Sequence, residues 1–196
     1  MVPHCRSGLP ALVLALMALA GCASDRTPGV KSYLDEKTAV TVRATSAPWV
    51  LAREMPELSA NSRDYLDLRL LEVDRMGDRL DYLSVVAWST VDRWVGVGAP
   101  ALGPLTLRID GDAVELKPAA ADSEAAGLSQ RMFARRHGQL AEAEYRVTPE
   151  LIGRMARANV VAVELTGSDG AVYEAWAPAR SAFAAFAGEP QLAGRR

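Results

Sequence analysis

The chain has 196 residues, with 22 Lys and Arg against 24 Asp and Glu and a formal net charge of −2. Because nucleic-acid binding requires a basic surface, this balance predicts no nucleic-acid partner. The two cysteines, Cys5 and Cys22, both lie near the N-terminus, which excludes a disulfide or a cysteine-ligated metal from the rest of the chain.

Residues 11–20 form an uninterrupted apolar run, which has the length of a signal-peptide core and is too short to span a membrane. The run leads into Leu19-Ala20-Gly21-Cys22. This motif resembles the lipobox of bacterial lipoproteins. The resemblance implies cleavage before Cys22, lipid attachment to its thiol and two or three acyl chains that hold the protein on a membrane. The alternative is an ordinary secretory signal that happens to contain a cysteine.

The resemblance also implies a location. In bacteria with two membranes, aspartate directly after the lipidated cysteine favours retention at the inner membrane. Ala23 stands there in this chain, so we expect delivery to the outer membrane, facing the periplasm. In a bacterium with one membrane, the same anchor would leave the domain outside the cell.

The same features predict the domain boundaries. We expect residues 1–21 to be the signal peptide, and residues 22–37 to be a lipidated flexible tether with no hydrophobic period. Residues 38–190 then form a single β-rich globular domain, and residues 191–196 a disordered tail. A chain of this length folds as one domain without a disulfide.

Short strands dominate the first half of the predicted domain. Residues 38–44 and 49–53 are rich in β-branched and aromatic side chains and are separated by Pro48. In residues 65–73, Leu66, Leu68 and Leu70 alternate with charged residues, which is the period of a half-buried strand. Residues 80–90 predict the returning strand, with Leu80, Tyr82, Val86 and Trp88 on one face. The turn between them is Arg75-Met76-Gly77-Asp78.

Two further hairpins and two helices are predicted downstream. Asp110-Gly111 lies between alternating residues 105–109 and 114–116 and indicates a type I′ turn. Pro118 ends that strand, and residues 118–130 are expected to be an exposed loop with no second core. A strand ends at residues 145–147, and Thr148-Pro149-Glu150 begins a helix that runs to Ala158. Residues 160–165 are expected to pair with residues 171–176 as a hairpin. Residues 179–187 form the last helix, with Phe183 and Phe186 on one face.

Together these elements predict a mainly β (α+β) fold, an antiparallel β-sandwich-like domain with two short helices in its C-terminal half.

The candidate catalytic and metal-binding residues are few. His137 is the only histidine after residue 21, and without cysteine partners we expect it to be a solvated surface residue and the domain to bind no metal or other cofactor. Acidic residues crowd the first long hairpin, where arginines are interleaved with them. We interpret this mixed charge as the solvated face of a strand pair. The acidic residues are Asp64, Asp67, Glu72, Asp74, Asp78 and Asp81.

Recognition is the remaining possibility. Trp94 begins an apolar, glycine-containing segment, residues 94–103, and an exposed tryptophan there would supply a binding contact. For Trp88 we expect core packing. The sequence therefore favours a non-enzymatic, membrane-anchored envelope lipoprotein that binds an envelope protein or a glycan. The alternatives are a periplasmic hydrolase that uses a carboxylate pair, and an accessory lipoprotein of a secretion or envelope-assembly machine.

Overall fold

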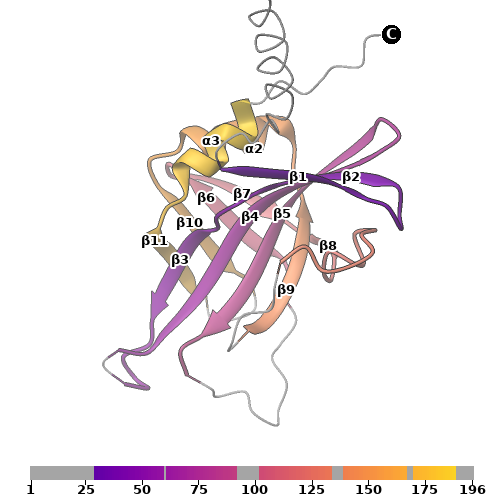
Figure 1. The fold of residues 1–196 in the computed structure, drawn as a ribbon. Helices are drawn as coiled ribbons and strands as arrows, with labels where there is room; N and C mark the ends of the chain where they lie inside the picture. The colour runs from indigo at the N-terminus through magenta and orange to yellow at the C-terminus, as the bar shows by residue number, and fades with distance from the viewer. Residues whose placement is uncertain (1–28, 60, 92–101, 134–138, 167–169, 189–196) are drawn as a thin grey trace, which may run out of the picture.

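The computed structural model describes residues 29–59, 61–91, 102–133, 139–166 and 170–188 (Figure 1). These residues form a mainly antiparallel β fold with two short helices, which confirms the predicted class. The elements are β1 Val30–Asp35, β2 Val40–Thr45, β3 Trp49–Glu54, β4 Arg63–Arg75, β5 Asp78–Ser89, β6 Leu105–Ile109, β7 Asp112–Leu116, β8 Pro118–Ala120, β9 Gln139–Arg146, α2 Pro149–Arg157, β10 Val161–Leu165, β11 Val172–Ala177 and α3 Arg180–Gly188.

The strands form one curved sheet with the order β7-β6-β10-β11-β3-β4-β5-β9-β8, which bends round into a sandwich- or barrel-like shape (Figure 1). The long strand β4 pairs with β3 along its first half and with β2 along its second half, and β1 pairs with β2. The pairing of β3 with β11 joins the N-terminal strands to the C-terminal ones. We call the side of the sheet that faces the main core its inner face and the opposite side its outer face.

Both predicted tight turns are present. Asp110 and Gly111 have φ angles of 50° and 98°, and Met76 and Gly77 have φ angles of 55° and 95°. Two successive residues with positive φ are the signature of the type I′ turn, whose twist matches that of the flanking strands. The Asp110 carboxylate also accepts hydrogen bonds from the backbone N–H groups of Asn159 and Val160. The turn is thereby tied to the start of β10.

The main core fills the inside of the curved sheet. Leu66, Leu68 and Leu70 lie on the inner face of β4, as the alternation predicted, and are buried. On β5, Leu80, Tyr82, Val86 and Trp88 share one face as predicted; it is the outer face, while Leu83, Val85 and Ala87 enter the main core. Apolar side chains stand on both faces of this strand, so the period-two pattern does not distinguish them.

The two predicted helices lie together at one end of the sheet (Figure 1). The Thr148 side chain accepts a hydrogen bond from the Leu151 N–H, so it caps the start of α2 as expected. On α3, Phe183 and Phe186 are buried, and the Phe183 ring meets Trp49 edge-on with ring centroids 5.4 Å apart. Within the described ranges, neither nine-residue helix is long or apolar enough to cross a bilayer.

A second, smaller core lies on the outer face, and the sequence analysis missed it. Its buried members are Val40, Val42, Ala44, Leu71, Val73, Tyr82 and Leu128. Residues 30–35, expected to belong to the tether, form β1, which covers this region together with β2. Residues 118–130, expected to be an exposed loop, contribute β8 and Leu128. These predictions were wrong because each segment supplies only a few apolar residues, and the core exists only once they assemble.

Candidate functional site

The residues singled out from the sequence are only partly described by the structure. Cys22, Trp94 and His137 lie outside the described residues. Trp88, expected to pack in the core, is half-buried on the outer face of β5, where its ring stacks on Tyr65 with centroids 4.1 Å apart. This contact brings two aromatic side chains together on the outer face near the start of β4.

An aromatic row crosses the outer face there. Tyr65 on β4 is stacked on Trp88 on one side and meets Trp176 of β11 on the other, with ring centroids 6.2 Å apart and an interplanar angle of 75°. Trp176 is 54% exposed, whereas Tyr65 is buried. The row therefore ends in a large aromatic side chain that presents much of its surface to solvent.

The strand register explains how residues from separate strands meet. Ala52 of β3 lies between Tyr65 and Glu174 in the pairing of β4, β3 and β11. Because the Ala52 side chain is small, the Trp176 ring passes over β3 and reaches Tyr65. A register shift between Ala175 and Ala177 interrupts the regular pairing of β11 at Trp176, and such irregularities commonly redirect a side chain.

Arg63 holds the exposed indole from a second direction. Its guanidinium carbon lies 4.6 Å from the centre of the Trp176 ring, and a guanidinium over an indole face is attracted by the ring electrons. The Arg63 Nη2 atom also donates a 3.0 Å hydrogen bond to Glu54 Oε1, and this hydrogen bond raises the pKa of Arg63. Trp176 is thus exposed but restrained. We call Trp176, Tyr65, Trp88, Arg63 and Glu54 the Trp176 surface.

The interpretation of the acidic residues on the first long hairpin as a solvated face was wrong for part of the set. Asp64, Asp67 and Glu72 are buried, and Asp67 is only 2% exposed. Asp67 Oδ1 accepts a 2.9 Å hydrogen bond from the Trp88 indole N–H, which fixes the ring that supports Tyr65. By the alternation of β4, Asp67 lies on the outer face, whereas Asp64 and Glu72 lie on the inner face. The prediction failed because the charge pattern of an isolated hairpin does not show which positions the rest of the fold covers.

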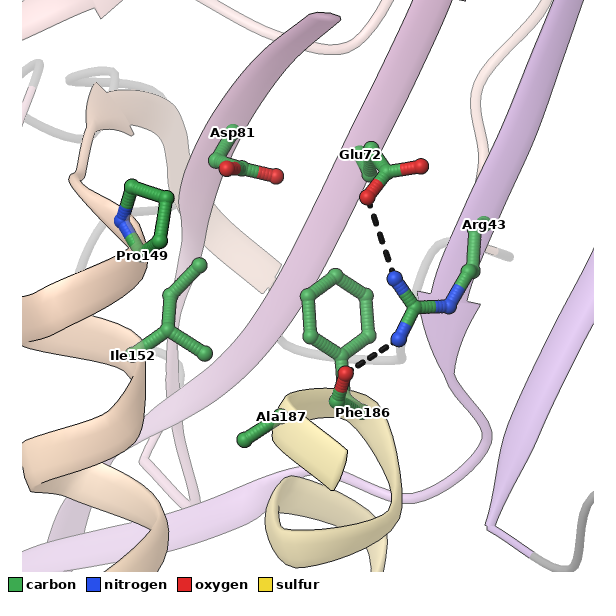
Figure 2. A pocket seen from close by; sticks show the side chains of 7 residues that line it. All are labelled: Arg43, Glu72, Asp81, Pro149, Ile152, Phe186 and Ala187. Carbon is green, nitrogen blue, oxygen red and sulfur yellow. Dashed lines mark hydrogen bonds and ion pairs between the residues drawn. The ribbon is translucent and has the colours of Figure 1, made fainter. Parts of the chain in front are cut away.

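Two carboxylates of the hairpin line a small cavity beside the helices (Figure 2). Glu72 and Asp81 are cross-strand partners on β4 and β5, and Arg43 on β2 forms a 3.0 Å ion pair with Glu72. Arg43 also donates to the Phe186 carbonyl and lies over the Phe186 ring. Burial, and secondarily the charge of Glu72, raises the pKa of Asp81. The cavity is lined by Arg43, Glu72, Asp81, Pro149, Ile152, Phe186 and Ala187.

The volume of this cavity, about 40 Å³, limits what it can hold. It accommodates a few water molecules and no organic substrate. The one arginine of the cavity, Arg43, is bound to Glu72 and to the Phe186 carbonyl. Its side chain therefore links β2 to β4 and to the end of α3. Elsewhere in the described ranges, Asp, Glu, His and Cys side chains do not gather into a group of three that would hold a metal ion.

Another buried carboxyl lies on the outer face of β9. Glu144 is 0% exposed, and its Oε1 accepts a 3.1 Å hydrogen bond from Ser84 Oγ. Its Oε2 has no hydrogen-bond partner among the described residues. Burial raises the pKa of Glu144 to about 8, so this carboxyl is protonated at neutral pH. The neighbouring Glu142 is paired with Arg131 at 2.8 Å, and Arg131 also pairs with Asp122.

Trp176 was missed as a candidate because the residues that surround it come from other strands, and the sequence does not show which strands are neighbours. It was recognised only as the last residue of a strand. Its exposure depends on the register shift in β11, and its support comes from Arg63 and Tyr65, which are more than 100 residues away in sequence.

Comparison with known proteins adds no assignment. No family model matches the sequence, and neither the characterised proteins nor the solved structures contain a significant match.

Proposed function

We propose that this protein is a non-enzymatic lipoprotein of the bacterial envelope, anchored through lipid on Cys22, whose β domain binds another envelope component through the Trp176 surface. The observation that carries the binding role is the state of Trp176, which is 54% exposed yet restrained by Arg63 and Tyr65. A large aromatic side chain that is already ordered loses little conformational entropy on binding. Such tryptophans, with neighbouring arginines, dominate the binding free energy of many interfaces.

The partner is an envelope protein or a glycan. Either would meet an aromatic face flanked by the charged groups of Arg63 and Glu54, which offer hydrogen bonds at the rim of the contact. This arrangement, an apolar centre with a polar border, is the usual anatomy of a binding surface. An accessory role in a secretion or envelope-assembly machine is a special case of the same proposal.

A hydrolase that uses a carboxylate pair is less well supported. Glu72 and Asp81 lie close together, but their cavity of about 40 Å³ is too small for a substrate. Glu144 has the raised pKa of a general acid, yet it is completely buried and cannot touch a substrate without movement of the segments that cover it.

The binding role is tested by cross-linking in intact cells followed by purification and identification of the attached component. Trp176→Ala should reduce the yield of a defined partner at least tenfold, because hot-spot truncations cost about 2 kcal/mol or more. The matched control is Met76→Ala, which removes another exposed apolar side chain at a distant hairpin tip. Equal yields from the two variants would refute the assignment of this surface.

The anchor is tested separately with Cys22→Ser. This variant lacks the thiol that accepts the lipid, so it should not be cut by the lipoprotein-specific peptidase. Mass spectrometry of the N-terminus gives the result. A Cys22→Ser protein that is still cut before residue 22 and stays tightly on the membrane contradicts the anchor.

Trp94 stays a prediction as a second recognition residue. If it contributes, Trp94→Ala should weaken partner capture and leave the thermal midpoint nearly unchanged. A buried tryptophan would instead cost about 3–5 kcal/mol of stability when truncated. Thermal unfolding of this variant therefore distinguishes a recognition residue from a core residue.

A further inference from the structure

The folded domain begins at its helix-bearing end. Gly29, directly before β1, accepts a 2.8 Å hydrogen bond from Ser46 N and packs against α3, where an added Cβ would lie 2.9 Å from Ala182 Cα. Figure 1 shows α2 and α3 together at this end, while the connection between β3 and β4 lies at the opposite end of the sheet. The position at which the chain enters the domain is therefore well defined.

Only residues 23–28 separate Cys22 from Gly29. Even a fully extended chain of this length reaches only about 25 Å, at roughly 3.5 Å per residue. Strand β4 alone, with 13 residues, is about 40 Å long at roughly 3.3 Å per residue. If Cys22 carries the lipid, as proposed above, the connection is shorter than the domain, so the end that bears Gly29 must stay close to the bilayer.

This end carries a group of basic side chains. Arg154 and Arg157 lie in the last turn of α2, and Arg180 begins α3 and donates a hydrogen bond to the Asn159 carbonyl. Lys31 is exposed on β1, next to the point of entry. The exposed Arg157 side chain forms no hydrogen bond or ion pair with the other described residues.

The acidic groups of this end are largely engaged. The Asp110 carboxylate accepts the N–H groups of Asn159 and Val160, and Asp112 is paired with Arg154 at 3.0 Å. Glu150 is exposed at the opposite, N-terminal end of α2. Val160 directly follows Asn159, to which Arg180 donates, and its apolar side chain is 58% exposed. The chain as a whole is acidic, so this collection of cations beside an exposed valine is a local feature.

We propose that the α2–α3 end of the domain lies on the bilayer surface, with Arg157 and Arg180 against the phosphates of anionic lipid headgroups and Val160 at the headgroup boundary. This inference rests on the proposed lipid anchor. A basic side chain near an anionic surface strengthens binding only about fivefold, which is too little to hold a protein alone. The covalent anchor supplies the high local concentration that makes so weak a contact effective.

In this orientation the contact between protein and lipid selects one posture of the domain. The connection between β3 and β4 points away from the membrane, and the sides of the sheet, including the Trp176 surface, stay open to the surrounding compartment. The lipid anchor limits the distance between the domain and the bilayer, while the arginines determine the orientation of the domain on the bilayer surface.

The orientation is tested with the full lipidated chain in liposomes of phosphatidylcholine and phosphatidylglycerol. Lipidation consumes the Cys22 thiol and processing removes Cys5, so one introduced cysteine is the only free thiol. Ser181→Cys, in the first turn of α3, and Glu57→Cys, between β3 and β4, would each carry an environment-sensitive fluorophore. Quenching by lipids with a nitroxide near the headgroup then reports the distance of each position from the bilayer. We expect at least threefold stronger quenching at position 181 than at position 57.

The contribution of charge is tested in the Ser181→Cys background with Arg157→Gln and Arg180→Gln together. The pair should reduce quenching at least twofold in vesicles with phosphatidylglycerol and have little effect in pure phosphatidylcholine. The control is Arg108→Gln, which removes an exposed arginine paired with Glu164 on the sheet.

The outcomes separate this inference from the anchor on which it rests. If the wild-type chain does not float with the vesicles and its Cys22 carries no lipid, the anchor itself is wrong. If the chain is lipidated and floats, but positions 181 and 57 are quenched equally or position 57 more strongly, the orientation is wrong and the anchor stands. Unchanged quenching in the arginine variants would overturn the role of the headgroups.

Discussion

The two faces of the β4–β5 hairpin are built from the same strands but by different means. The inner face is apolar along its middle and joins one large core, to which β4 contributes Leu66 and Leu68 and β5 contributes Val85. Towards the helices it carries Glu72 and Asp81. The outer face is divided into a small second core and a row of aromatic rings, where the buried Asp67 carboxylate accepts a hydrogen bond from Trp88. Burial in the middle of the inner face follows from hydrophobicity, whereas burial of Asp67 on the outer face depends on a specific polar partner.

The sharpest test of this comparison uses two buried leucines of the same strand. Leu68 lies in the main core and Leu71 in the second core, and both are fully buried. Leu68→Ala should cost about 4 kcal/mol of unfolding free energy, and Leu71→Ala about 2–3 kcal/mol, because a smaller cluster can relax around the cavity. Urea denaturation measures both. A cost below about 0.5 kcal/mol for Leu71→Ala, as expected of a surface residue, would show that the second core does not exist.

The next effect concerns the buried polar group. The pKa of Glu144 rises from an ordinary value of 4.5 to about 8 in the folded protein. Between these values the folded state holds a proton that the unfolded state has lost, so this carboxyl makes stability fall as the pH rises from about 5 to 8. The fall should total roughly 3–5 kcal/mol and level off above pH 8.

Glu144→Gln isolates this contribution, since the amide has nearly the same shape, can still accept the hydrogen bond from Ser84 and does not ionise. The variant and the wild type should be similarly stable near pH 5, and the variant should be clearly more stable at pH 8. Denaturation curves at several pH values give the difference. Parallel pH profiles for the two proteins would mean that Glu144 is solvated.

A smaller effect is expected at the aromatic row. Ala52→Leu would place a larger side chain between Tyr65 and Glu174 and lift Trp176 away from Tyr65. Because this site is near the surface, the stability should change by no more than about 1 kcal/mol. The near-ultraviolet circular dichroism of the aromatic residues should change and partner capture should fall severalfold. Val172→Leu, at an exposed position of the same strand β11, is the control that should alter neither.

The smallest effect is a gain in stability at the hairpin tip. Met76 is 98% exposed and has a φ angle of 55°, a conformation that costs an ordinary side chain energy and that asparagine tolerates. Met76→Asn should therefore stabilise the protein by about 0.5–1 kcal/mol and raise the thermal midpoint by roughly 1–4 °C. A lower midpoint would indicate that the Met76 side chain makes a stabilising contact.

The sequence predicted those parts of the fold that depend on local pattern. The Asp110-Gly111 turn, the capped start of α2 and the leucine face of β4 were all correct, because each is determined by residues a few positions apart. The second core and strand β1 were missed, since their apolar residues become a cluster only when β1, β2, β4 and residues 118–133 come together.

The candidate site was less predictable than the fold, for the same reason. Trp88 was expected to pack in the core, and its actual partners Tyr65 and Asp67 follow from strand register. Trp176 depends in addition on the register shift in β11 and on the small side chain of Ala52. The burial of Asp67 reversed the expected role of the hairpin carboxylates, because alternation of charge does not reveal whether another segment covers the charged face.

Because β3 pairs with β11, the sheet joins segments that leave the ribosome about 120 residues apart. At typical rates of synthesis, β11 emerges roughly 6 to 24 seconds after β3. Throughout that interval one edge of β3 has no native partner, and an open strand edge is a template for pairing with other chains. The topology thus delays completion of the sheet until nearly the whole chain has been made. Such a delay suits the proposed export, in which a chain is threaded through a membrane before it folds.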